Sequence, residues 1–104
     1  MIANQLSFDC FADATRRTIL EMLKHGERPV GMIAADLPVS RPAVSQHLRL
    51  LERAGLVTHR SAGTRNYYRL DTRGFAELRA YLDSFWTDVL DAYASSVPEE
   101  HDDH

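Results

Sequence analysis

Apolar residues recur at intervals of three and four along most of the chain, which is the spacing of one face of a helix. The pattern predicts a short apolar helix around residues 6–11, then a helix that Asp13 caps and Gly26 ends. A second short helix is expected over residues 30–37, because Pro38 cannot continue it. Three short helices thus occupy the first third of the chain.

From Ser40 to Ala54 polar and apolar residues separate onto opposite halves of one helix. Ser40 is a suitable N-cap, Pro42 fits the first turn, and Gly55 follows the end. His47 is the one polar residue in the apolar half, and we interpret it as a hydrogen-bonded interior histidine rather than a metal ligand. The polar half holds Arg41, Pro42, Ser45, Gln46, Arg49, Glu52 and Arg53.

After this helix the pattern changes to that of a β-hairpin. Residues 56–60 and 66–70 are rich in β-branched and aromatic side chains, and they flank a small, polar and basic segment with a turn near Gly63. A short helix, a turn at residues 38–39, an amphipathic helix and a basic hairpin are the order of a winged helix-turn-helix. The predicted fold is therefore mainly α with a small β-hairpin wing.

A long amphipathic helix is expected to begin at Asp71 or Thr72, although Gly74 weakens its first turn. Its large apolar side chains again recur at intervals of three and four, as in a helix-packing seam. A chain of 104 residues has too little core to cover all of them, so part of the seam is expected at a dimer interface. These residues are Phe75, Leu78, Leu82, Phe85, Val89 and Tyr93.

Length and composition limit the class of protein. The 104 residues suffice for one domain, predicted over residues 1–94, and the acidic residues 95–104 are expected to form a disordered tail. No signal peptide or spanning helix is recognisable, so we expect a cytoplasmic protein without a membrane partner. The single cysteine, Cys10, fits a reducing compartment and is interpreted as a small buried apolar residue rather than a redox switch.

The charges are distributed unevenly along the chain. The formal net charge is −3, yet the segment from Ser40 to Arg73 carries seven arginines and only two acidic residues. From Gly74 onward a single arginine, Arg79, stands against eight acidic residues. A basic middle third can meet DNA phosphates while the acidic end points elsewhere, since salt screens their repulsion beyond about 10 Å.

The order of motifs resembles the ArsR family of bacterial winged-helix repressors over about residues 6–86. The resemblance rests on residues 40–48, on Leu51 with residues 54–57, and on Gly63 followed by residues 67–70. Residues 13–20 are similar to the start of that family's second helix, although the family usually has proline at Ala14. Gly31 and Met32 also differ from the polar residues that the family has there.

The resemblance implies a homodimer formed through the first and last helices, with the amphipathic helix in the DNA major groove and the hairpin tip along the backbone. Arginine, serine and glutamine are side chains that bind base edges and phosphates. The residues expected to bind DNA are Ser40, Arg41, Pro42, Ser45, Gln46, Arg49, Arg60, Thr64 and Arg65. The residues expected at the dimer interface are Leu6, Phe8, Leu78, Leu82, Phe85, Trp86 and Val89.

The metal-sensing sites known in this family are not expected here. Residues 30–37 contain no cysteine and the long helix contains no histidine, while His101 and His104 lie in a tail without supporting structure. No metal or other cofactor is therefore predicted, and the sequence does not identify an inducer. For Phe85 and Trp86, a role in the core or dimer interface is favoured over a small-ligand pocket.

Two functions from different classes remain to be compared. The sequence favours a dimeric, sequence-specific transcription regulator, most simply a repressor that binds a partly palindromic operator in double-stranded DNA. The alternative is a winged helix used as a protein-interaction module, which would have no reason to place Arg41, Ser45 and Gln46 beside a basic wing. An enzyme is not expected, because no nucleophile elbow, metal-ligand spacing or phosphate-binding glycine loop is present.

Overall fold

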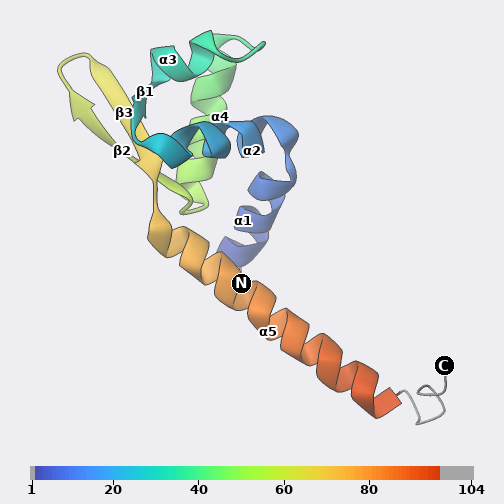
Figure 1. The fold of residues 1–104 in the computed structure, drawn as a ribbon. Helices are drawn as coiled ribbons and strands as arrows, with labels where there is room; N and C mark the ends of the chain where they lie inside the picture. The colour runs from blue at the N-terminus through green and yellow to red at the C-terminus, as the bar shows by residue number, and fades with distance from the viewer. Residues whose placement is uncertain (1, 97–104) are drawn as a thin grey trace.

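The computed structural model describes residues 2–96 and contains helices together with one small sheet. Figure 1 shows the sheet and the shorter helices gathered into one body, from which the last helix extends away as a single rod. The elements are α1 (Ile2–Ala12), α2 (Ala14–Met22), the 3-10 turn η1 (Leu23–His25), β1 (Arg28–Pro29), α3 (Val30–Ala35), α4 (Arg41–Arg53), β2 (Val57–Ala62), β3 (Arg65–Leu70) and α5 (Thr72–Ser96). The predicted winged helix-turn-helix is confirmed.

The predicted helix caps are present. The Asp13 carboxylate accepts a hydrogen bond from the Arg16 amide at 3.0 Å, and the Ser40 hydroxyl accepts one from the Ala43 amide at 3.2 Å. Gly55 follows α4 with a φ of 82°, a conformation that favours glycine. Helix α3 ends at Ala35, two residues before the predicted end.

The sheet has a third strand that the sequence did not predict. Strand β1 pairs antiparallel with β3, giving the order β1-β3-β2, with Arg28 opposite Tyr68 and Pro29 opposite Tyr67. Two residues, one of them proline, are too few to show an alternating pattern. The hairpin β2–β3 was predicted, and its turn includes Gly63 with a φ of 62°.

The core lies where α1, α2, α3, α4 and the sheet meet. Side chains of Ile19, Ile33, Val44, Leu48, Leu51 and Leu56 are completely buried there. Cys10 is also completely buried and its thiol lies 3.9 Å from the Leu50 carbonyl oxygen, which confirms its interpretation as a small buried residue. Burial raises the pKa of that thiol.

Gly74 joins α5 to the body. A Cβ at this position would overlap the carbonyl oxygen of Gly55, so the first turn of α5 approaches the α4–β2 turn more closely than any side chain permits. The Asp71 amide donates to the Leu56 carbonyl at 2.9 Å beside this contact. The glycine that weakens the helix on propensity is therefore required for packing.

Helix α5 continues through Ser96, so it includes two residues that the sequence assigned to the acidic tail. Residues 97–104 lie outside the described part of the chain, and His101 and His104 with them. Within residues 2–96, no helix combines the length and apolar character that crossing a bilayer requires.

Candidate nucleic-acid interface

Helix α4 presents its polar half to solvent as predicted. Val44, Leu48 and Leu51 are completely buried, whereas Gln46 and Arg49 are exposed on the other side. Ser40 caps the helix with its hydroxyl oxygen, so its first role is structural, and Pro42 occupies the first turn. The exposed face of α4 thus begins at a fixed, capped end.

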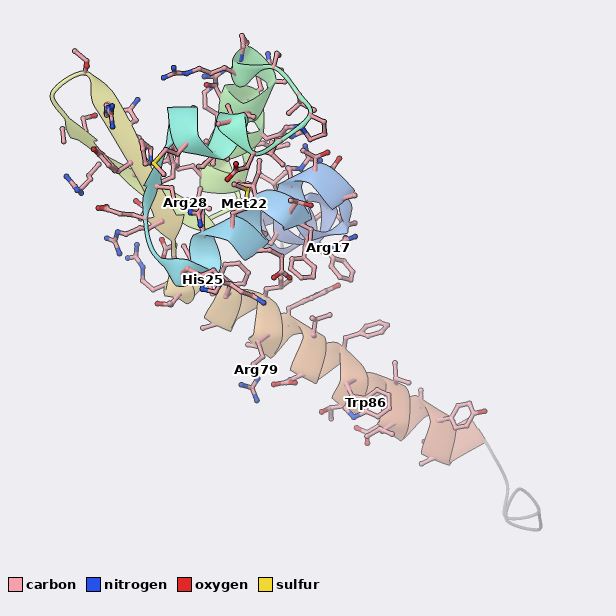
Figure 2. All side chains as sticks on the ribbon, turned by 45° about the horizontal axis from the view of Figure 1, so that its top comes forward. Arg17, Met22, His25, Arg28, Arg79 and Trp86 are labelled. Carbon is pink, nitrogen blue, oxygen red and sulfur yellow. The ribbon has the colours of Figure 1, made fainter. Side chains whose placement is uncertain are left out.

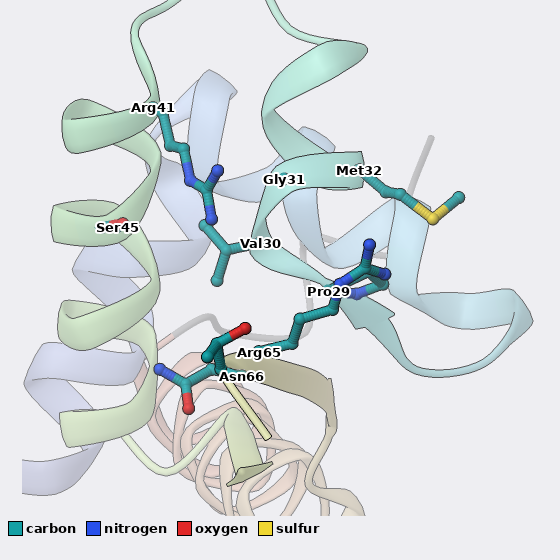
Figure 3. Close-up of a pocket in the computed structure, with 9 residues that line it drawn as sticks. Pro29, Val30, Gly31, Met32, Arg41, Ser45, Arg65 and Asn66 are labelled. Carbon is teal, nitrogen blue, oxygen red and sulfur yellow. The ribbon is translucent and has the colours of Figure 1, made fainter. Parts of the chain in front are cut away.

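A cavity of about 280 Å³ lies between α3, α4 and the tip of the wing. Figure 3 shows Arg41 reaching from α4 toward α3, while Arg65 and Asn66 approach from the wing below it. The Arg41 guanidinium packs against Gly31, where an added Cβ would lie 3.6 Å from its Nη1 atom. The cavity lining comprises Pro29, Val30, Gly31, Met32, Arg41, Ser45, Thr64, Arg65 and Asn66.

Four residues predicted to bind DNA therefore meet at one place, two from α4 and two from the wing. Met32 lines the same cavity and leaves 55% of its surface exposed. Gly31 and Met32, which differ from the family pattern, thus lie beside the residues expected at the DNA. Their position follows from the packing of α3 against α4, which the sequence pattern alone did not specify.

Arg60 is positioned differently from the other predicted DNA-binding residues. Its guanidinium donates to both carboxylate oxygens of Glu27, at 2.7 Å and 3.0 Å, and lies 4.7 Å above the ring of Tyr67. The hydrogen bonds from Arg60 lower the pKa of the Glu27 carboxyl. Arg60 does not line the cavity that contains Arg41 and Arg65.

The acidic residue on the polar half of α4 is also paired within the chain. A carboxylate oxygen of Glu52 lies 2.8 Å from Nδ1 of His59 in β2, and the His59 ring packs 5.0 Å from that of Tyr68. These contacts hold the base of the wing against the end of α4. They also turn the Glu52 carboxylate toward β2.

His47 is half-buried rather than interior, but it is hydrogen-bonded as predicted. Its Nδ1 lies 3.2 Å from the Nη1 of Arg16 on α2. Among residues 2–96, no group of three histidine, cysteine or acidic side chains is arranged to hold a metal ion.

The residues expected at a dimer interface divide into two groups. Leu78 retains only 6% exposure within the single chain and Leu6 packs against the core, so both contribute to the body itself. Phe85 and Trp86 are each 58% exposed, and Figure 2 shows Trp86 on the part of α5 that leaves the body. The exposed apolar residues also include Phe8, Phe11, Tyr81, Leu82, Leu90 and Tyr93.

The predicted set of interface residues does not include all of these exposed apolar residues. The rings of Tyr81 and Phe8 pack edge to face with centroids 6.4 Å apart, which joins α5 to α1. Tyr81 and Leu90 repeat the interval of three or four residues that the other apolar positions follow, so the pattern contained the signal.

Comparison with known proteins shows the family to which the chain belongs. Residues 13–59 match the model of the family described as bacterial regulatory protein, arsR family. The chain is 55% identical over 97 residues to the HTH-type transcriptional regulator Rv2034 of Mycobacterium tuberculosis, covering 93% of this chain and 91% of that protein. The chain belongs to the ArsR family. It is a DNA-binding transcription regulator with a winged helix-turn-helix fold.

Two further proteins are similar to the chain. The transcriptional repressor SdpR of Bacillus subtilis is 38% identical over 65 residues, which cover 62% of this chain and 72% of that protein. The solution structure of a homodimeric winged helix-turn-helix DNA-binding domain from Mycobacterium bovis, described as a possible ArsR-family transcriptional regulator, superposes with a TM-score of 0.67 at 31% identity. That alignment covers 88% of this chain and 84% of that domain.

Proposed function

We propose that this ArsR-family protein is a repressor that binds a partly palindromic operator as a homodimer. The observation that carries the proposal is the cavity where Arg41 and Ser45 of α4 meet Thr64 and Arg65 of the wing. These are side chains that hydrogen-bond base edges and phosphates, and they are supplied by the two elements that a winged helix brings to DNA. The similarity to the repressor SdpR supports the direction of regulation.

The proposed interface divides into base-reading positions on α4 and phosphate-binding positions at the wing tip. Arg41 and Gln46 have the length and the donor groups for bidentate contacts to guanine and adenine. Ser45 and Arg49 lie between them on the same face, while Ser40 and Pro42 fix the start of the helix. Thr64 and Arg65 at the wing tip are assigned to backbone phosphates, which position the protein without reading sequence.

Two copies of the chain are needed to read an operator of useful length. One recognition helix contacts only a few base pairs, and two helices about 34–36 Å apart reach successive major grooves on one side of the duplex. The exposed apolar residues of α5, with Phe8 of α1, are suited to join the copies. The homodimeric state of the related domain from Mycobacterium bovis supports this arrangement.

Occupying a promoter in this way would exclude other proteins from the DNA, and the protein would act at the nucleoid in the cytoplasm.

The protein-interaction module is the competing function. It is disfavoured because the exposed polar half of α4 and the wing tip bring arginines together on one surface, which a neutral protein partner would not require.

Duplex binding measured over a range of salt concentrations tests the proposal. The operator is first selected from a random duplex pool, and the affinities of variants are then compared by fluorescence anisotropy. We expect Arg41→Ala and Gln46→Ala each to cost about 1–3 kcal/mol and to relax base preference. Arg65→Ala should weaken all sequences alike and reduce the salt slope.

Two results would contradict the proposal. Binding without salt dependence would favour the interaction module, because phosphate contacts release counterions. An equal loss of base preference in all three variants would reject the division between α4 and the wing.

A further inference from the structure

A second groove runs along α4 on the side opposite the wing. It has a volume of about 370 Å³ and brings α2 together with the middle and end of α4. Three arginines and a histidine line it, and no carboxylate does so among the described residues. The lining consists of Arg16, Ala43, Gln46, His47, Arg49, Leu50 and Arg53.

The contact between Arg16 and His47 fixes the chemistry of the histidine ring. An arginine guanidinium can only donate hydrogen bonds, so the Nδ1 atom of His47, which lies 3.2 Å from Arg16 Nη1, must accept. In this hydrogen bond the ring is the neutral tautomer with its proton on Nε2, because both nitrogens of an imidazolium are donors and neither can accept. His47 therefore offers an Nε2–H donor from the wall of the groove.

Arg16 itself is mostly buried, with 18% of its side chain exposed. Its guanidinium lies 3.6 Å from the Asp13 carboxylate, which already accepts the backbone amide of Arg16 as the cap of α2. The Nε atom of Arg16 is buried without a hydrogen-bond partner. Burial and the Asp13 carboxylate thus hold the Arg16 guanidinium in place beside His47.

The two basic cavities lie on opposite flanks of α4. Arg41 and Ser45 border the cavity beside the wing, whereas His47 and Arg53 border the groove beside α2. A helix inserted into the major groove of B-DNA, about 12 Å wide, has one sugar-phosphate backbone on each flank. Each flank of α4 therefore has basic side chains where a backbone would pass.

We propose that the groove beside α2 binds a backbone phosphate on the flank opposite the wing. Arg49 and Arg53 contribute positive charge, His47 donates a neutral hydrogen bond from Nε2, and Arg16 acts as a positioning residue that holds the His47 tautomer. This inference rests on the proposed binding of α4 to DNA. It adds a role for α2, which lies outside the helix-turn-helix.

The test uses the full chain and the selected duplex, with affinity measured against salt concentration. Arg53→Ala should lower the salt slope by about 1.8, since each phosphate contributes about 0.9 and a dimer loses two. His47→Leu should weaken binding about tenfold and leave the slope unchanged, because the donor that it removes carries no charge. This combination separates the two kinds of contact.

Conservative and control variants complete the experiment. His47→Gln should stay within about threefold of the wild type, because its amide can accept from Arg16 and donate to a phosphate. Arg16→Gln alone should weaken duplex binding. Combined with His47→Leu it should cause little further loss of affinity, as expected of a residue that acts through its neighbour. Arg79→Ala on α5 removes an exposed arginine far from α4 and should change neither affinity nor slope.

The inference would be overturned if Arg53→Ala and His47→Leu both kept the operator affinity and salt slope of the wild type. If Arg41→Ala and Arg65→Ala still weakened binding in that case, the proposed function would stand without the phosphate site beside α2. Loss of salt-dependent binding by the wild type would instead reject the proposed function. A shift of the His47 Nε2 resonance with inorganic phosphate alone, equal to that with duplex at the same ionic strength, would mean a general anion site and also overturn the inference.

Discussion

The body of the protein and the outer part of α5 place their apolar residues in opposite ways. In the body, Ile19 and Leu48 are completely buried by neighbouring elements of the same chain. On α5, Phe85 and Trp86 follow an equally regular helical spacing but remain 58% exposed. The same kind of pattern therefore corresponds to buried core residues in the body and to exposed apolar residues on α5.

The charges follow the same division. The body carries arginines on both flanks of α4, whereas the outer part of α5 is acidic apart from Arg79. An apolar and acidic rod is poorly suited to approach DNA, and it is well suited to meet a second copy of itself along its apolar side. This contrast underlies the proposal that the body binds DNA and that α5 joins two copies of the chain.

The largest effect is expected from a charge on the exposed apolar side of α5. Phe85→Asp should shift the protein from dimer to monomer, because a carboxylate would be buried in an apolar interface. Operator affinity should then fall about 100-fold or more, since linked binding to two half-sites is lost. Sedimentation equilibrium and duplex titration measure the two effects.

The matched control for this variant lies in the body. Arg65→Ala should weaken DNA binding while leaving the protein dimeric, because Arg65 is exposed at the wing tip, at the end of β3 away from α5 (Figure 1). A wild type that is monomeric at micromolar concentration, yet binds a palindromic site tightly and without cooperativity, would refute the role of α5.

The junction between the two regions provides the next prediction. Gly74→Ala should lower the free energy of unfolding by about 1–3 kcal/mol, because the new methyl group would overlap the Gly55 carbonyl oxygen. Helix propensity alone predicts the opposite, a gain of about 1 kcal/mol. Urea denaturation at fixed protein concentration distinguishes the two signs.

Ala76→Gly is the control for Gly74→Ala, because Ala76 is exposed in the same turn region of α5. It should lose about 1 kcal/mol through helix propensity alone. A stabilised Gly74→Ala protein would mean that the contact between α5 and the α4–β2 turn is looser than the structure has it.

Most of the body could be predicted from the sequence because its boundaries depend on local chemistry. Asp13 and Ser40 each cap a helix because their side chains accept the backbone amide three residues ahead, and Gly55 adopts a backbone conformation that favours glycine. The polar half of α4 followed from helical spacing alone. Such signals need no knowledge of what lies elsewhere in the chain.

Features that depend on contacts between distant segments were not predictable in this way. Strand β1 is defined by its pairing with β3, and the need for Gly74 arises from Gly55, which is close in space only after folding. The groove beside α2 likewise requires Arg16 to reach His47 across 31 positions of sequence. Spacing along one helix carries no information about these partners.

A moderate effect is expected at the start of α2, within the body. Asp13→Ala should cost about 1 kcal/mol of stability, because an orphan amide of the first turn loses its acceptor. The bond from the Arg16 amide holds the pKa of the Asp13 carboxyl below its usual 3.8. The stabilisation is therefore complete at neutral pH and is lost as the pH falls through the lowered pKa.

Urea denaturation of the wild type and Asp13→Ala proteins at pH 7 and near pH 3 checks this sign. The difference between them should be largest at pH 7 and smaller at the acidic pH. The dimer should be unaffected at neutral pH, because Asp13 lies in the body. A difference that grows on acidification would mean that the carboxylate does not stabilise the native state.

The smallest effect is expected at Arg60, which sharpens the assignment of the wing. The sequence places Arg60 with Arg65 among the DNA-binding residues, but the structure holds its guanidinium between the Glu27 carboxylate and the Tyr67 ring. Since Glu27 already balances its charge, Arg60→Ala should change operator affinity less than about threefold, and loss of this exposed ion pair should change stability little. Glu27→Gln provides the complementary test, because it releases the arginine and should strengthen duplex binding in low salt.

The contrary result would be a loss of affinity and salt slope in Arg60→Ala as large as in Arg65→Ala. It would mean that Arg60 of the wild type leaves Glu27 to bind a phosphate, and that the phosphate-binding part of the wing extends from its tip along β2.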